Sequence, residues 1–191
     1  TGRLCDMEKI DRIAKEHNLL VIEDAAQSMG ARTSVFRSGS VGDLAAFSFN
    51  PMKVFPGYGE AGAIVTDDAQ FDRRLRMLRY LGTREKEVCV EPSLNYKMDE
   101  IQAAMLLTGF GRIDSIVEKR NSLARQYSLN LSNIVRCPPV AREENYVSNY
   151  YDYVIVCENR DGLRQYLKSR GIETKVKHPL LMPDHPAYKE S

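Results

Sequence analysis

The sequence between residues 19 and 66 reads LLVIEDAAQSMGARTSVFRSGSVGDLAAFSFNPMKVFPGYGEAGAIVT. It contains three apolar runs, at 19–22, 45–49 and 63–66, each bounded by polar or glycine-containing segments. A short continuous apolar run is typical of a strand that is covered on both faces, as in a parallel sheet. The stretch therefore predicts an α/β domain whose ligand-binding residues lie at the carboxyl ends of its strands.

Helical patterns flank these runs. Residues 6–17 carry apolar side chains at helical spacing after Asp6, which is a good N-cap. A second helix is expected to begin near Asp67, with Phe71 and Leu75 on its apolar face. Its other face is basic, with Arg73, Arg74, Arg76 and Arg79. These arginines indicate a solvated helix surface in the first place and a binding patch in the second.

The pattern turns helical again from Met98, and Gly109 and Gly111 interrupt it before a further helical stretch. Two glycines between helical patterns suggest a bend, so we place a domain boundary between residues 111 and 112. Beyond it the sequence predicts strands at 151–156 and 173–177. A helix at about 161–169 would stop at Gly171, which suits the end of a helix. This part is expected to be a small α+β unit.

The chain has 191 residues, enough for one well-buried core or for one large unit and part of a second. Its net charge of +1 gives no electrostatic reason to expect nucleic acid or an anionic membrane as a partner. No apolar run approaches the roughly 20 residues that span a bilayer, and no signal peptide is evident. Four widely spaced cysteines without a CxxC pair are typical of a reduced protein, so we expect a cytoplasmic location.

Two residues near strand ends could carry chemistry. Asp24 follows the first apolar run, where α/β proteins bind ligands, although a solvated carboxylate or a helix N-cap is the simpler interpretation of this residue alone. Lys53 follows the second run and precedes three glycines, so it could be a Schiff-base nucleophile or a phosphate ligand. Taken alone, it is more simply an exposed loop lysine.

A third motif, NYKMDEIQAA, covers residues 95–104. Asp99 is a plausible N-cap for the helix that follows, but this role does not account for Asn95. Several common motifs are absent: GxxxxGK[ST], GxGxxG and GxSxG. The histidines His17, His178 and His185 do not have the spacing of a metal site, so we expect no metal.

In this order along the chain, VIEDAAQS, GSVGDLAAFSFNPMK, GYGEAGAIVT and LNYKMDEIQAA resemble the DegT/StrS-type sugar aminotransferases, from Gly2 to about Tyr188. These are fold-type I pyridoxal 5′-phosphate (PLP) enzymes. The resemblance implies that residues 1–111 are the C-terminal part of the PLP-binding large domain, a mostly parallel sheet with helices. Residues 112–191 would be an incomplete small α+β C-terminal domain.

The resemblance also implies cofactor-binding roles for five residues. Asp24 would keep the pyridine nitrogen protonated, which makes the ring an electron sink. Gln27 would lie beside the ring and its phenolic oxygen, and Ser48 would donate a hydrogen bond to the phosphate. Lys53 would hold the cofactor covalently and, once released by substrate, would move the proton between the donor's α-carbon and the cofactor. Asn95 would reach across a homodimer interface to the neighbour's phosphate.

On the substrate side, the resemblance points to Tyr58 and His178. The implied reaction moves an amino group from glutamate or glutamine to a keto sugar that is carried on a nucleotide. Related sugar dehydratases have histidine in place of the lysine, so Lys53 favours amino transfer. Met52, Pro56 and Ala61 depart from the usual residues of the family; none removes a catalytic atom, but each could reshape the substrate side.

Family members have a long N-terminal portion before the position of Gly2. It supplies a helix N-terminus for the phosphate and an aromatic residue that stacks on the ring. We expect the isolated 191 residues, which would lack this portion and the final helices, to bind PLP weakly or not at all. A truncated, non-catalytic remnant that persists as a folded or binding module stays open as an alternative. A generic α/β phosphate binder is a third interpretation, but it leaves the order of Asp24, Gln27, Ser48 and Lys53 unexplained.

Overall fold

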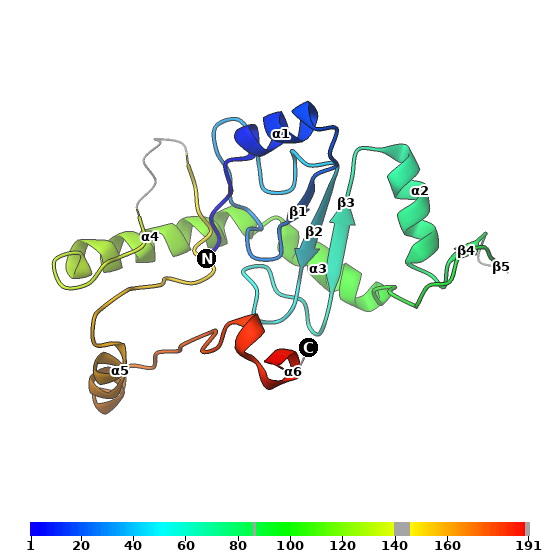
Figure 1. Cartoon of the computed structure of the whole chain (residues 1–191). Helices are drawn as coiled ribbons and strands as arrows, with labels where there is room; N and C mark the ends of the chain where they lie inside the picture. Colours follow the sequence, from blue (N-terminus) through cyan, green and yellow to red (C-terminus); the bar gives the residue numbers. More distant parts are fainter. Residues whose placement is uncertain (86, 140–145, 190–191) are drawn as a thin grey trace. The chain divides into compact units, whose positions relative to one another are not determined.

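The computed structural model describes residues 1–85, 87–139 and 146–189. Contacts divide the chain into two compact units, Thr1–Val154 and Ile155–Ser191. The first unit contains α1 (Met7–Glu16), β1 (Ile22–Asp24), β2 (Leu44–Ser48), β3 (Gly62–Val65), α2 (Ala69–Leu78), β4 (Thr83–Arg84), β5 (Val88–Cys89), α3 (Glu100–Phe110) and α4 (Ile113–Leu131) (Figure 1). The second contains α5 (Arg160–Ser169), the short 3-10 helix η1 (Met182–Asp184) and α6 (Pro186–Lys189).

The main sheet has the strand order β1-β2-β3. β1 runs parallel to β2, and β3 runs antiparallel to β2. The register pairs Asp24 with Ala46 and Ser48 with Gly62. β1 and β2 therefore end at the same edge of the sheet, as the α/β prediction requires, while β3 makes the sheet mixed.

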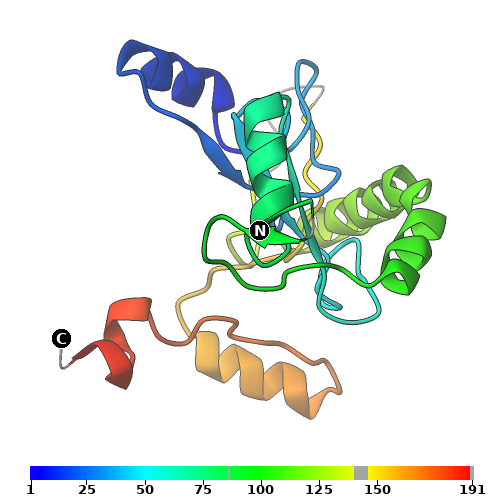
Figure 2. The same ribbon diagram turned by 90° about the vertical axis from the view of Figure 1, so that its right-hand side faces the viewer.

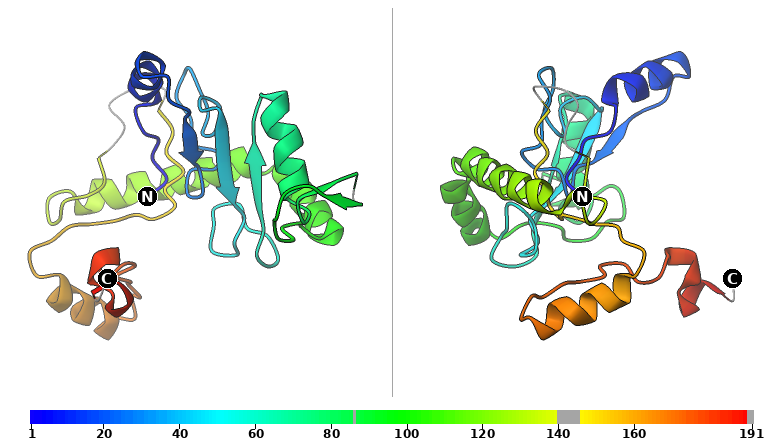
Figure 3. Two further views of the ribbon diagram at one scale, coloured as in Figure 1. Left: turned by 45° about the vertical axis from the view of Figure 1, so that its right-hand side comes forward. Right: turned by 90° about the vertical axis from the view of Figure 1, so that its left-hand side faces the viewer.

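Helices α3 and α4 cover one face of this sheet, as Figures 2 and 3 show. Successive side chains of a strand point to opposite faces. Phe47 and Ala63 face the helices and pack against a buried cluster in which α3 contributes Leu106 and α4 contributes Val117. The same cluster includes Phe49, Val54, Phe55 and Ile113. The loop that follows β2 is therefore anchored in the core on both sides of Lys53.

The opposite face of the sheet is more open. Ile22 and Ile64 point to this face, and their side chains are 68% and 56% exposed. Asp24, Ala46 and Ser48 share it, because residues paired in register or two apart along a strand point the same way. The run at 19–22 is thus not covered on both faces by the residues that the structure describes, contrary to the prediction. Pairing starts only at Ile22, because β2 begins at Leu44.

Two predicted strands, at 151–156 and 173–177, are also not formed among the described residues. A strand needs a hydrogen-bonded neighbour, and apolar alternation alone does not supply one. The guanidinium of Arg120 binds the carbonyl oxygens of Asn149, Tyr150 and Tyr151, which therefore bond to a side chain rather than to a strand. The second unit consequently contains helices but no sheet in its described part.

The helix predictions are largely confirmed. The Asp6 carboxylate caps α1 by accepting a hydrogen bond from the Lys9 N–H. Helix α2, expected to begin near Asp67, begins at Ala69 with Asp68 as its N-cap. Asp99 stands at the N-cap of α3 without a side-chain capping bond. Gly171 has a φ of +75°, the left-handed conformation that ends α5.

The predicted boundary between residues 111 and 112 differs in position from the division into compact units after Val154. Gly111 caps α3 with ordinary helical backbone angles, and Ile113 of α4 joins the same buried cluster as Phe55. A division into compact units does not show which residues belong to the large and small domains that the family resemblance implies. The boundary between residues 111 and 112 therefore stays a prediction. In the part of the chain that the structure describes, no helix combines the length and apolar character needed to cross a membrane.

Candidate functional site

Asp24 is the last residue of β1 and lies on the open face of the sheet. Its side chain is exposed, and Oδ1 accepts a hydrogen bond from the Ala26 N–H at 3.1 Å. This bond orients the carboxylate in the turn that leaves the strand. Because the residue is exposed, the carboxylate also faces the open side of the sheet.

Ser48 closes β2 at the same edge of the sheet, on the same face as Asp24. Its hydroxyl oxygen accepts a bond from the Asn50 N–H at 3.3 Å, and its own hydrogen is available to an acceptor. The two predicted cofactor residues thus come from neighbouring parallel strands. A carboxylate and a hydroxyl donor are thereby placed on one surface at the carboxyl ends.

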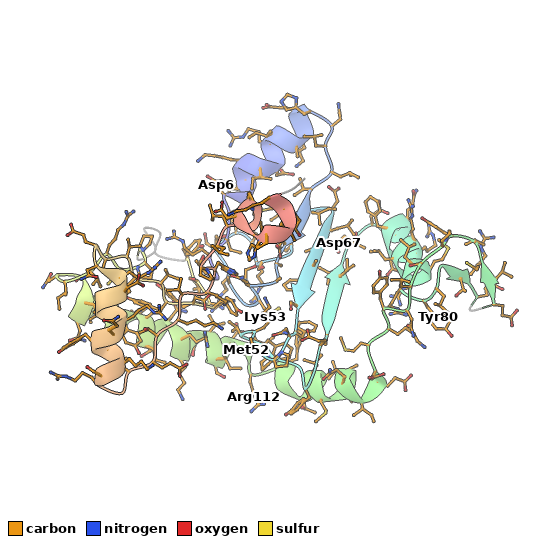
Figure 4. The ribbon with its side chains drawn as sticks, turned by 60° about the horizontal axis from the view of Figure 1, so that its bottom comes forward. Asp6, Met52, Lys53, Asp67, Tyr80 and Arg112 are labelled. Carbon is orange, nitrogen blue, oxygen red and sulfur yellow. The ribbon has the colours of Figure 1, made fainter. Side chains whose placement is uncertain are left out.

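The segment 49–61 makes a tight loop after β2. The Phe49 N–H donates to the Ala61 carbonyl at 2.8 Å, and the Gly57 N–H donates to the Phe49 carbonyl at 2.6 Å. Asn50 fixes the inner turn, accepting from the Lys53 N–H at its carbonyl and donating through its side chain to Glu60. Figure 4 labels Met52 and Lys53 in this loop. Lys53 is therefore half-buried, and hydrogen bonds hold the backbone of its loop, unlike the exposed loop lysine that was the simpler interpretation.

The glycines after Lys53 have a steric role. A Cβ on Gly57 would lie 3.0 Å from the Phe49 carbonyl oxygen and 3.3 Å from Oε1 of Gln102. The same Gln102 oxygen accepts a hydrogen bond from the Tyr58 N–H at 2.7 Å. Helix α3 thus holds the lysine loop through Gln102. Sequence reasoning missed this role, although Gln102 belongs to the NYKMDEIQAA motif.

The side chain of Lys53 lies against an aromatic ring. Its Nζ is 5.0 Å from the ring centroid of Tyr151, which comes from the distant segment that follows α4. Among the described residues, no carboxylate lies within ion-pair distance of this Nζ. The amine is thus not held in a salt bridge there.

Gln27 follows β1 by three residues, in the loop that leaves the same sheet edge. Its side-chain oxygen accepts a hydrogen bond from the backbone nitrogen of Thr1 at 2.8 Å. Its carbonyl accepts one from the side chain of Asn149 at 2.9 Å. Asn149 is completely buried and also donates to the Met29 carbonyl, so it fixes this loop from within. The pattern-based reasoning gave no sign of Asn149.

The other predicted site residues are Asn95, Tyr58 and His178. Asn95 forms an isolated bridge with Tyr80 beyond α2, and Figure 4 shows Tyr80 well away from Lys53. The Tyr58 side chain is 76% exposed. His178 is exposed and belongs to the second unit. These three residues stay predictions.

Glu23 is a structural residue that the sequence reasoning also missed. Next to Asp24 but on the opposite face, it is buried, and its carboxylate accepts hydrogen bonds from the N–H groups of Gly39, Val41 and Gly42, each at 2.8 Å. These bonds hold the loop that leads into β2. The signal available in the sequence was the pair of glycines in GSVG, which allows backbone amides to approach a carboxylate closely.

A hollow of about 760 Å³ lies between α2 and the β4–β5 hairpin. It is lined by the α2 arginines together with Tyr80, Thr83 and Lys97. Two of the arginines pair with acids, Arg74 with Glu91 and Arg76 with Asp72. All four predicted arginines are exposed, which agrees with the solvated-surface interpretation.

The amino-acid sequence matches the DegT/DnrJ/EryC1/StrS aminotransferase family over residues 1–191. Among curated proteins, it is 34% identical over 192 residues to the erythromycin biosynthesis sensory transduction protein EryC1 of Saccharopolyspora erythraea, covering 99% of the chain and 52% of that protein. It is 36% identical over 189 residues to dTDP-3-amino-3,4,6-trideoxy-alpha-D-glucose transaminase of Streptomyces venezuelae, covering 98% of the chain and 49% of that protein. The chain spans about half the length of the curated relatives it matches.

Solved structures also include proteins with the same fold. The fold is similar to that of S. venezuelae DesV in complex with a ketimine intermediate, with a TM-score of 0.92 and 36% identity over 99% of this chain and 51% of that chain. It is equally similar, with a TM-score of 0.92 and 33% identity, to a DegT DnrJ EryC1 StrS aminotransferase from Brucella abortus, of which it covers 50%. Since the family match spans all 191 residues and these structures share the fold, the chain belongs to the DegT/DnrJ/EryC1/StrS aminotransferase family.

Proposed function

We propose that the protein is a PLP-dependent aminotransferase that moves an amino group from glutamate or glutamine to a keto sugar carried on a nucleoside diphosphate. The observation that carries this proposal is the arrangement at the carboxyl edge of the sheet. Asp24 and Ser48 share one face there, and Lys53 follows in a loop that backbone hydrogen bonds hold in place. Membership of the family and relatives named as nucleotide-sugar transaminases support it.

The residues present fit the cofactor chemically. PLP has a pyridine nitrogen, a phosphate and an aldehyde, and when bound it supplies an electron sink for the carbanion formed in amino transfer. The exposed Asp24 carboxylate is the group that would hold a proton on the ring nitrogen. The Ser48 hydroxyl is a hydrogen-bond donor suited to a phosphate oxygen. The Lys53 amine, free of an ion pair among the described residues, is a nucleophile suited to an aldehyde carbon.

Lys53 would also move the proton. Once the amino donor has displaced it, the Nζ would take the proton from the donor's α-carbon and deliver it on the cofactor side. This role requires that the amine reach both positions from a fixed backbone. The hydrogen bonds of the 49–61 loop and the burial of Val54 and Phe55 support such a fixed attachment.

The remaining assignments follow from the family. Gln27 would lie beside the ring, and Tyr58 and His178 would contact substrate. Asn95 would serve the phosphate of a second subunit, in a homodimer whose sites are shared. The exposure of Asn95 beyond α2, away from Lys53, is compatible with a residue that acts on a neighbouring copy.

The half-reaction tests this function directly. The protein is incubated with PLP and either L-glutamate or L-glutamine, and the corresponding keto acid is measured by mass spectrometry, with Lys53→Ala as the matched control. Where the protein binds PLP, even weakly, we expect keto acid to form with the wild type and none above background with the variant.

Wild-type protein that forms no keto acid calls for the same measurement on a form that includes any segment encoded upstream of Thr1. Keto acid from that form would support the function and explain the deficit by missing cofactor contacts. A folded form of this kind that still gives none contradicts the proposal and favours a non-catalytic module.

A further inference from the structure

Residues 148–151, here called the strap, cross between the two loops that carry the proposed cofactor residues. At one end, the Ser148 hydroxyl and the Asn149 N–H both bond to the Gly2 carbonyl, at 2.9 and 3.2 Å. In the middle, the Asn149 side chain donates to the carbonyls of Gln27 and Met29, each at 2.9 Å. The strap is thus joined to the loop that follows β1 by bonds from a completely buried side chain.

Helix α4 holds the strap from the other side. The Arg120 guanidinium bonds to the carbonyl oxygens of Asn149, Tyr150 and Tyr151 at 2.9 to 3.2 Å. Asn121 donates to the Ser148 carbonyl at 2.7 Å. Four consecutive carbonyl groups are therefore fixed by two side chains of one helix, and the backbone of the strap has little freedom.

This fixed backbone sets the position of the Tyr151 ring. The Tyr151 N–H donates to Oδ1 of Asn149 at 2.9 Å, and Tyr150 before it has a φ of +46°, which turns the chain at this point. The ring packs against the buried cluster and lies 5.0 Å from the Lys53 Nζ. A cation within about 6 Å of an aromatic centroid is attracted by the electron-rich face of the ring.

We propose that Tyr151 is a positioning residue for Lys53: in the protein without a bound aldehyde the ring holds the Lys53 side chain in place, and the strap holds the ring. Its significance for catalysis rests on the proposed function of Lys53, but the contact itself does not. The strap also fixes the Gln27 loop, so the same segment positions both the Lys53 amine and the loop that follows β1.

The contact has a chemical consequence. An aldehyde must reach the Lys53 Nζ, and the contact with the ring restricts the motion of this amine. Removing the ring should therefore make Lys53 more reactive toward a small aldehyde. An indirect structural effect would change many lysines together, and replacing tyrosine by phenylalanine, which keeps the ring, should restore the original reactivity.

The test is limited reductive methylation of the protein with formaldehyde and cyanoborohydride, with methylation of each lysine quantified by peptide mass spectrometry. We expect Tyr151→Leu to raise the rate at Lys53 about two- to fivefold, and Tyr151→Phe to leave it near the wild-type rate. The matched control is Tyr80→Leu, because Lys97 Nζ lies 4.4 Å from the Tyr80 centroid. That variant should raise the rate at Lys97 and leave Lys53 unchanged.

An unchanged Lys53 rate in Tyr151→Leu, or an equal rise in Tyr151→Phe, overturns the proposal. Should Tyr151→Leu not fold, NMR of the wild type decides instead. Ring-current shifts should move the Lys53 ε-methylene signal upfield, with the assignment made by its disappearance in Lys53→Arg, and a signal at the ordinary position overturns the contact. Neither measurement uses PLP, so failure of amino transfer and failure of this contact are separate results.

Discussion

Two adjacent carboxylates, Glu23 and Asp24, have opposite surroundings because β1 directs successive side chains to opposite faces. Glu23 is buried and accepts three backbone hydrogen bonds. Asp24 is exposed on the open face of the sheet. The same functional group thus holds the fold together at one position and is exposed on the open face at the next.

This contrast predicts separable effects of two conservative substitutions. Glu23→Gln removes one of the acceptor oxygens and should lower the free energy of unfolding by about 1.5–3 kcal/mol. Asp24→Asn keeps an oxygen for the Ala26 N–H, so stability should change little, while the rate of keto-acid formation should fall by roughly 10²- to 10³-fold. Urea unfolding and the glutamate half-reaction measure the two effects. Equal loss of stability in both variants would contradict the assignment.

At the scale of single elements, helix ends are where local chemistry decides structure. Asp68 accepts hydrogen bonds from the N–H groups of Gln70 and Phe71, at 2.6 and 3.1 Å, and so begins α2. Its neighbour Asp67 precedes the cap and is labelled in Figure 4. Two aspartates in succession made the start of this helix ambiguous in the sequence.

Replacing Asp67 and Asp68 one at a time tests whether Asp68 is the N-cap of α2. Asp68→Ala should lower the free energy of unfolding by about 1 kcal/mol, because two N–H groups lose their acceptor. Asp67→Ala, with the same loss of charge, should have less than about half that effect. Urea unfolding of both variants is the measurement, and a larger loss in Asp67→Ala would show that the cap is misplaced.

The N-cap of α1 should make the stability of the protein depend on pH. Hydrogen bonds from the Lys9 ammonium and the Lys9 N–H lower the pKa of Asp6 below the ordinary value of 3.8. A depressed folded-state pKa means that the contribution is fully present above about pH 4 and is lost as the pH falls through the folded value. Asp6→Asn, which keeps a capping oxygen, should therefore lose less stability between pH 6 and pH 3 than the wild type. Identical pH profiles in urea unfolding would contradict this account.

The sequence predicted the elements that depend on local patterns. Five helices and the strands β1, β2 and β3 follow apolar periodicity, caps and glycines, and the parallel pair places Asp24 and Ser48 as expected for an α/β sheet. It could not predict contacts between distant segments. Arg120 bonds to carbonyl groups that were expected to be in a strand, and Asn149 and Tyr151 meet Gln27 and Lys53 across more than 90 residues of chain. Such contacts have no periodic signature.

The whole chain divides into two compact units and spans about half the length of the curated relatives it matches. The sheet of the first unit has an open face with exposed Ile22 and Ile64 beside Asp24. Apolar side chains on a sheet face are ordinarily covered by a second layer. We therefore expect the complete site to need further protein surface, whether from the same polypeptide or from a second subunit.

The division into units predicts a site of proteolysis. Brief digestion with a protease of broad specificity should cut between Val154 and Asn159 and leave a resistant fragment that ends near Val154, since the two compact units meet along the chain at this point. Mass spectrometry of the fragments gives the cut positions. A dominant cut near Gly111 would support the boundary predicted from the glycines instead.

The proposed function requires that Lys53 is the lysine that binds the cofactor. The most direct measurement is to incubate the protein with PLP, reduce with borohydride, and map the phosphopyridoxyl group by peptide mass spectrometry, with Lys53→Ala and Lys97→Ala as paired variants. In a folded form that includes any segment encoded upstream of Thr1, we predict a single dominant label on Lys53 that is lost in Lys53→Ala and kept in Lys97→Ala. Label spread over many lysines, and equally strong in Lys53→Ala, in a folded form that includes any segment encoded upstream of Thr1, would contradict the claim.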